Sequence, residues 1–142
     1  MFFDLNKCVG HITENAIKQI SEAFGHRLQD SGITRIQWIA LYYVKTNKKI
    51  SQRELSNLMN VQDSSVGRLI DRLERDGLIK RERDSSDRRV IYIKLSDEGD
   101  KLISDLIPLG IKFNKDLISG IDEKELIIYE KVLQKMLLNI TK

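Results

Sequence analysis

The stretch from Val61 to Gly99 constrains the fold most, because it joins a helical repeat directly to two strand-forming runs. Four apolar residues recur at helical spacing and therefore share one face of a predicted helix: Val66, Leu69, Ile70 and Leu73. Gly77 is typical of a helix end, and the runs before and after residues 84–89 are rich in β-branched and aromatic side chains. We therefore predict a helix followed by a two-stranded ribbon.

The tip of this ribbon is strongly polar. Its sequence, Asp-Ser-Ser-Asp-Arg-Arg over residues 84–89, contains no apolar side chain, so we expect it to project into solvent. Arg68 and Arg72 lie on the outer face of the predicted helix. Duplex DNA fits both features, because a helix fills the major groove and a protruding arginine suits the negative minor groove. We expect Asp87 to hold Arg89 in a fixed position.

The same stretch resembles the MarR family. Asp87-Arg88-Arg89 followed by Leu95-Ser96-Asp97-Glu98-Gly99 is similar to that family's wing signature, and residues 73–79 are similar to its exit from the recognition helix. The resemblance covers nearly the whole chain. It implies a homodimeric winged helix-turn-helix transcriptional regulator in which Arg89 enters the minor groove. We use the name wing for the ribbon and its tip.

We predict three groups of DNA-contacting side chains. Residues at the start of a helix near residue 52 are expected to hold phosphate, residues of the recognition helix to read or flank the major groove, and wing residues to contact or support contact with the minor groove. The predicted set is Ser51, Gln52, Arg53, Gln62, Ser64, Ser65, Arg68, Arg72, Arg83, Asp87, Arg88 and Arg89. The alternative is a solvated helix face on which Asp71 and Glu74 pair with Arg68 and Arg72.

The remaining sequence predicts a mainly helical fold in one domain over residues 1–142. Apolar spacing predicts helices over residues 4–30, 35–46, 52–59, 97–118 and 122–139. Capping signals begin four of them, at Thr34, Ser51, Ser96 and Asp122. We assign residues 34–95 to a winged helix-turn-helix lobe, and 4–30 and 97–140 to dimerisation helices.

The last predicted helix is apolar around more than one side, which indicates burial against more than one neighbour. A second copy of the chain is the simplest cover, and it matches the dimer that the resemblance implies. A dimer would present two recognition helices about one DNA turn apart and would favour a pseudo-palindromic site.

Composition limits the other classes of function. The chain has a single cysteine, no long apolar run and no signal-peptide pattern, so we expect a cytoplasmic protein without a disulfide or membrane partner. No phosphate-binding glycine loop, nucleophile elbow or zinc-protease motif occurs, so we expect no enzyme activity and no cofactor. His11 and His26 lack neighbours at metal-ligand spacing, which argues against a zinc site.

Three hypotheses remain beside simple operator binding. Phe24, Trp38 and Tyr42 could line a site for a small aromatic effector, as the resemblance implies, or could be plain core. Cys8 could sense oxidants, as a cysteine near this place does in some members of the family, or could be inert. A winged helix could instead bind a protein, but that use favours an apolar or acidic outer helix face, and this sequence has arginines there.

Overall fold

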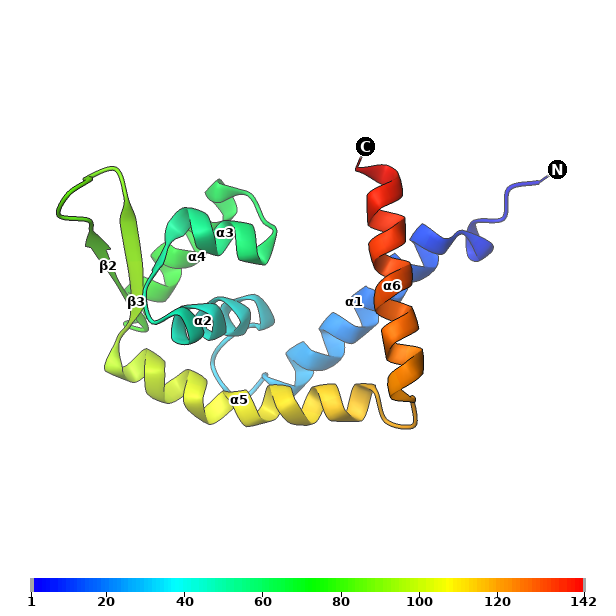
Figure 1. Ribbon diagram of the computed structural model, residues 1–142. Helices are drawn as coiled ribbons and strands as arrows, with labels where there is room; N and C mark the ends of the chain where they lie inside the picture. The colour runs from blue at the N-terminus through cyan, green and yellow to red at the C-terminus, as the bar shows by residue number, and fades with distance from the viewer. Residues whose placement is uncertain (1, 142) are drawn as a thin grey trace. The chain divides into compact units, whose positions relative to one another are not determined.

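The computed structural model describes residues 2–141 and contains, in that part of the chain, six α-helices and one three-stranded sheet (Figure 1). The chain divides into two compact units, which meet in sequence between Gly110 and Ile111. The elements are η1 (Leu5–Lys7), α1 (Val9–Arg27), α2 (Arg35–Asn47), β1 (Ile50–Ser51), α3 (Gln52–Met59), α4 (Asp63–Arg75), β2 (Ile79–Arg83), β3 (Ile91–Leu95), α5 (Asp97–Leu117) and α6 (Glu123–Ile140).

The N-terminal segment differs from the single helix predicted over residues 4–30. Asp4 accepts a hydrogen bond from the backbone N–H of Asn6 and begins a short 3-10 turn, and Cys8 is extended with φ −74° and ψ 120°. An extended residue cannot continue a helix, so α1 begins only at Val9. The prediction was wrong here because apolar spacing alone does not locate a break between two helical turns.

The capping signals locate the other helices well. Thr34 and Gln37 form the reciprocal capping box at the start of α2, and Asp122 and Glu125 form another at the start of α6. Ser51 accepts the backbone N–H of Glu54 at 3.1 Å, but no reciprocal bond is found there. Helices α2, α3 and α6 therefore agree with the predicted bounds to within a residue or two.

The sheet has three antiparallel strands rather than the two predicted. β3 lies in the middle, paired with β2 on one side and with the two-residue strand β1 on the other. Ile50 of β1 pairs with Ile93 of β3, and both are almost completely buried. Because β1 leads directly into α3, this pairing ties the first helix of the helix-turn-helix to the wing. In Figure 1, β2 and β3 extend away from the helices as a hairpin.

One hydrophobic core joins α2, α3, α4, the sheet and the first part of α5. α4 buries Val66, Ile70 and Leu73 completely or nearly so, as the predicted helical face requires, while Leu69 packs at the core's edge. α2, α3, the sheet and the first part of α5 contribute the other buried side chains: Ala40, Leu41, Val44, Ile50, Leu55, Ile79, Ile93 and Ile103. The outer face of α4 is consequently left for polar residues.

The junction between the wing and α5 is unusually close. Ser96 accepts the backbone N–H of Gly99 at 3.0 Å, and its hydroxyl donates to the carbonyl of Gly77 at 2.6 Å. A Cβ on Gly99 would lie 1.9 Å from the carbonyl oxygen of Leu78, so only glycine fits. The Leu-Ser-x-x-Gly pattern therefore has a physical cause: it packs the first turn of α5 against the exit of α4.

Helix α6 leaves most of its large apolar side chains exposed within the chain. Exposed residues include Ile127, Ile128, Tyr129, Val132, Leu137, Leu138 and Ile140. α1 likewise exposes Val9, Ile12 and Ile17. α5 remains one helix through Pro108.

Candidate nucleic-acid interface

The outer face of α4 carries the predicted recognition residues. Ser64, Arg68 and Arg72 are exposed and Ser65 is half-buried, while the opposite face is in the core. Gln62 is the N-cap residue of α4, but its side chain makes no capping hydrogen bond. Within residues 2–141, neither Arg68 nor Arg72 has a hydrogen bond or an ion pair with another side chain. Two guanidinium groups are thus available to an external partner.

The alternative pairing of Asp71 and Glu74 with these arginines is wrong. Both acids bind Arg81 of β2 instead: its Nη2 lies 2.5 Å from Asp71 and its Nη1 lies 3.3 Å from Glu74. Arg81 reaches α4 because its register partner on β3 is the buried Ile93, which sets its side chain on the inner face of the sheet. Sequence spacing missed this residue, since its contacts are not local.

The middle of α3 is held against the start of α4 by a buried serine. Ser56 is 2% exposed, and its hydroxyl lies 2.6 Å from a carboxylate oxygen of Asp63, the first residue of α4. Its hydroxyl also lies 2.8 Å from the carbonyl of Arg53. This contact fixes the turn between the two helices, and the sequence analysis did not single it out.

Asp87 and Arg89 form the pairing expected at the wing tip. Arg89 Nε and Nη2 lie 3.1 and 3.3 Å from the two carboxylate oxygens of Asp87, and the backbone N–H of Arg89 donates to Asp87 at 3.0 Å. These side-chain and backbone hydrogen bonds lower the pKa of Asp87. The Arg89 side chain is nevertheless 91% exposed. Asp87 therefore orients an arginine that remains accessible.

The two other wing arginines differ in their surroundings. Arg83, the last residue of β2, donates from Nη1 to the carbonyl oxygen of Arg88 at 2.6 Å across the hairpin. Arg88 itself is exposed. Arg83 thus helps to hold the shape of the tip, in addition to the contact with DNA that the sequence predicts for it.

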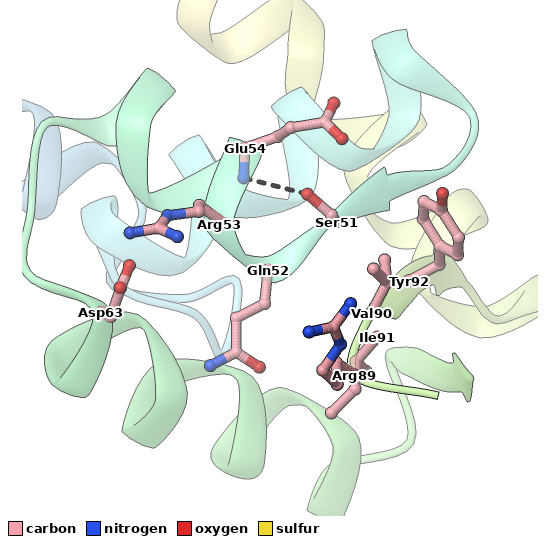
Figure 2. A pocket seen from close by; sticks show the side chains of 9 residues that line it. All are labelled: Ser51, Gln52, Arg53, Glu54, Asp63, Arg89, Val90, Ile91 and Tyr92. Carbon is pink, nitrogen blue, oxygen red and sulfur yellow. Dashed lines mark hydrogen bonds between the residues drawn. The ribbon is translucent and has the colours of Figure 1, made fainter. Parts of the chain in front are cut away.

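A hollow of about 730 Å³ lies between the start of α3 and the wing. In Figure 2, Gln52 from α3 and Arg89 from the wing approach it from different elements. Its lining residues are Ser51, Gln52, Arg53, Glu54, Asp63, Arg89, Val90, Ile91 and Tyr92. The structure therefore brings the predicted phosphate-binding residues Ser51, Gln52 and Arg53 to the same hollow as the wing arginine.

Phe24, Trp38 and Tyr42 form one aromatic cluster. The centroid of the Trp38 ring lies 5.2 Å from that of Phe24 in an edge-to-face arrangement. It lies 5.7 Å from the ring centroid of Tyr42 in a stacked arrangement. Trp38 also donates from Nε1 to the carbonyl oxygen of Leu106 on α5 at 3.0 Å. Phe24 is buried and Tyr42 is 37% exposed, so the cluster belongs partly to the packing and partly to the surface.

The remaining candidates lie elsewhere. Cys8 is half-buried and unpaired at the start of α1, and His11 of the same helix lies 3.2 Å from the side-chain amide of Asn15. Within the described part of the chain, no group of three or more potential metal ligands is found. No helix among residues 2–141 is long and apolar enough to cross a membrane.

Comparisons with known proteins agree with this geometry. The sequence model of the MarR family matches residues 31–90. The chain is 31% identical over 133 residues to the uncharacterized HTH-type transcriptional regulator YsmB of Bacillus subtilis (strain 168), covering 94% of this chain and 88% of that one.

Two solved structures have a similar fold. A complex of Staphylococcus aureus MepR with DNA has a TM-score of 0.87 at 23% identity and covers 94% of this chain and 98% of that one. Bordetella bronchiseptica BpsR also has a TM-score of 0.87, at 21% identity, and the match covers 96% of this chain and 97% of that one. The BpsR structure concerns the regulation of its DNA binding by 6-hydroxynicotinic acid.

Proposed function

This chain belongs to the MarR family of DNA-binding transcriptional regulators, and we propose that it acts as a homodimer that represses transcription from a pseudo-palindromic operator. One observation carries the proposal: the described residues leave Arg68, Arg72 and Arg89 accessible while the neighbouring acids are engaged within the lobe. In this proposal α4 occupies the major groove and Arg89 the adjacent minor groove.

The phosphate contacts come from the start of α3. Ser51 caps this helix, and Gln52 and Arg53 line the hollow that Arg89 also lines. Backbone N–H groups at a helix start favour an anion, and Arg53 adds a full charge. Such contacts set the orientation of α4 on the duplex without reading its sequence.

The exposed apolar side chains of α1 and α6 support the homodimer. Ile128, Tyr129 and Leu138 of α6 are each more than half exposed, as is Val9 of α1. Large exposed apolar side chains on a helix of this kind mark an interface, and a second copy of the chain supplies a matching surface. Sedimentation equilibrium is expected to give twice the mass of the 16.5 kDa chain.

We infer that a small aromatic compound regulates binding through the cluster of Phe24, Trp38 and Tyr42. Trp38 joins α2 to α5 through its indole N–H, so a compound that displaces the Trp38 ring would change how these helices pack. A ligand that binds one arrangement better than the other shifts the population accordingly. The regulation of BpsR by 6-hydroxynicotinic acid supports an effector of this class.

The direct test is binding to duplex DNA from upstream of the protein's own gene, measured by fluorescence anisotropy across a series of salt concentrations. Displacement of counterions predicts a log–log salt slope of roughly 0.9 per phosphate contacted. Own-promoter DNA should bind far more tightly than random duplex. If neither it nor any duplex selected from the genome is preferred, the proposal is wrong.

A further inference from the structure

We propose that Arg81 is a positioning residue that neutralises Asp71 and Glu74, so that α4 presents its arginines to DNA without competing acids. This inference rests on the proposed function. Arg81 itself lies in β2, on the inner face of the sheet, and need not touch the nucleic acid.

The geometry commits one guanidinium to both acids. Nη2 of Arg81 contacts Asp71 at 2.5 Å and Nη1 contacts Glu74 at 3.3 Å. The two acids are three residues apart on α4 and therefore lie on neighbouring turns of one face. A guanidinium can contact two carboxylates at once through separate nitrogens, whereas an ammonium acts as a single point charge.

Without Arg81, Asp71 would have other partners on α4. It follows Arg68 by three residues and precedes Arg75 by four, which are the spacings at which oppositely charged side chains pair on a helix. Such a pair would draw Arg68 away from a guanine edge. Unpaired acids would also place negative charge beside the phosphates. Either effect weakens binding to DNA.

The exposure of the two acids indicates that Arg81 matters more for DNA binding than for the stability of the fold. The Arg81 side chain is 26% exposed, and its Nε is buried without a hydrogen-bond partner in the structure. Asp71 is 67% exposed and Glu74 is 42% exposed. Because acids this exposed stay hydrated when a partner is removed, loss of Arg81 should affect DNA binding more than folding.

The same sheet offers a matched control. Lys94 of β3 pairs with Glu82 of β2 at 2.9 Å. Glu82 follows Arg81 directly, so its side chain points to the opposite face of the sheet, away from α4. Replacing either basic residue with methionine breaks a cross-element ion pair and removes one positive charge. Only Arg81→Met exposes acids on the recognition helix.

The experiment compares operator affinity for the wild type, Arg81→Met, Lys94→Met and the triple variant Arg81→Met/Asp71→Asn/Glu74→Gln, with circular dichroism as a check of folding. Arg81→Met should bind about tenfold more weakly, a change of about 1.4 kcal/mol, and the deficit should shrink as salt rises. Lys94→Met should stay within about twofold of the wild type, and the triple variant should recover to within about threefold.

Several results would overturn the inference. It fails if Arg81→Met binds as well as Lys94→Met, or if the triple variant remains as weak as Arg81→Met. Should Arg81→Met not fold, Asp71→Asn/Glu74→Gln decides: operator binding at least as tight as that of the wild type supports neutralisation, and weaker binding refutes it. A wild type that prefers no duplex refutes the proposed function itself, and the inference with it.

Discussion

Replacing Gly99 with alanine should destabilise the DNA-binding lobe by several kcal/mol. The new Cβ would lie 1.9 Å from the carbonyl oxygen of Leu78 and 2.8 Å from its carbonyl carbon. A carbon normally stays at least about 3.3 Å from a carbonyl oxygen, so α5 or the turn at Leu78 must shift by more than about 1 Å. The obstacle is backbone, which cannot rotate away as a flexible side chain can.

The magnitude follows from what that shift disturbs. Inserting a methyl group into a packed site costs roughly 1 to 3 kcal/mol. The Ser96 hydroxyl bridges Gly99 and Gly77, and Ser96 N–H donates to Leu78 at 3.0 Å, so the movement also weakens these hydrogen bonds, at about 1 kcal/mol for each one lost. With one of these three hydrogen bonds lost, the total is about 2 to 4 kcal/mol.

Thermal and urea denaturation measure this cost. A loss of that size should lower Tm by roughly 5 to 15 °C in a chain of this length. Gly67→Ala is the control, since its Cβ would lie 3.5 Å from the side-chain nitrogen of Gln52, an ordinary contact, and alanine favours a helix interior by about 1 kcal/mol. All chains are compared at one protein concentration, because the Tm of the proposed dimer would depend on that concentration. A Gly99→Ala chain as stable as Gly67→Ala would refute the reasoning.

Three further predictions concern the interface and its support. Arg68→Ala should reduce the preference for operator over random DNA by roughly 1 to 3 kcal/mol, whereas Arg75→Ala, on the last turn of α4, should not; equal losses would argue against a base contact. The pKa of the Asp87 carboxyl, followed by NMR, should lie below its ordinary 3.8 and rise towards it in Arg89→Ala; an unchanged value would mean that the two are not paired in solution. Trp38→Phe should lower stability by about 1 kcal/mol through loss of the indole hydrogen bond to α5, and an unchanged urea midpoint would contradict this.

The pH range in which Asp87 pairs with Arg89 follows from the direction in which the pKa of Asp87 is shifted. Since the folded carboxyl has a lowered pKa, its hydrogen bonds with Arg89 contribute fully above the ordinary value of 3.8 and are lost as pH falls through the lower folded value. The tip should therefore keep its geometry throughout the neutral range. Its loss in acid should appear in the Arg89 side-chain resonances.

The local parts of the fold could be predicted from the sequence because their causes are local. Thr34 and Gln37 reach each other across three residues, and so do Asp122 and Glu125, so the sequence alone located both helix starts. Asp87 and Arg89 are two residues apart, and their pairing was expected for the same reason. The apolar face of α4 likewise follows from spacing within one helix.

The parts that sequence analysis missed depend on contacts distant in the chain. β1 is only two residues long and is a strand solely because Ile50 and Ser51 pair with β3, some 40 residues later. The alternative pairing of Asp71 was sought on its own helix, since nothing in a helical repeat reveals that Arg81 approaches from the sheet. The extended Cys8 similarly interrupts a helix whose apolar spacing continues without a break.

The measurement that tests the account most directly is operator affinity for Arg89→Ala compared with Lys80→Ala. Both variants remove one exposed positive charge from the wing, but Arg89 is at the tip, oriented by Asp87, and Lys80 pairs in register with Lys94 at the other end of the ribbon. A groove arginine predicts a loss of roughly 1 to 3 kcal/mol for Arg89→Ala and a much smaller loss for Lys80→Ala. Equal losses would mean that the wing contributes only diffuse charge, and would contradict the proposed insertion of Arg89 into the minor groove.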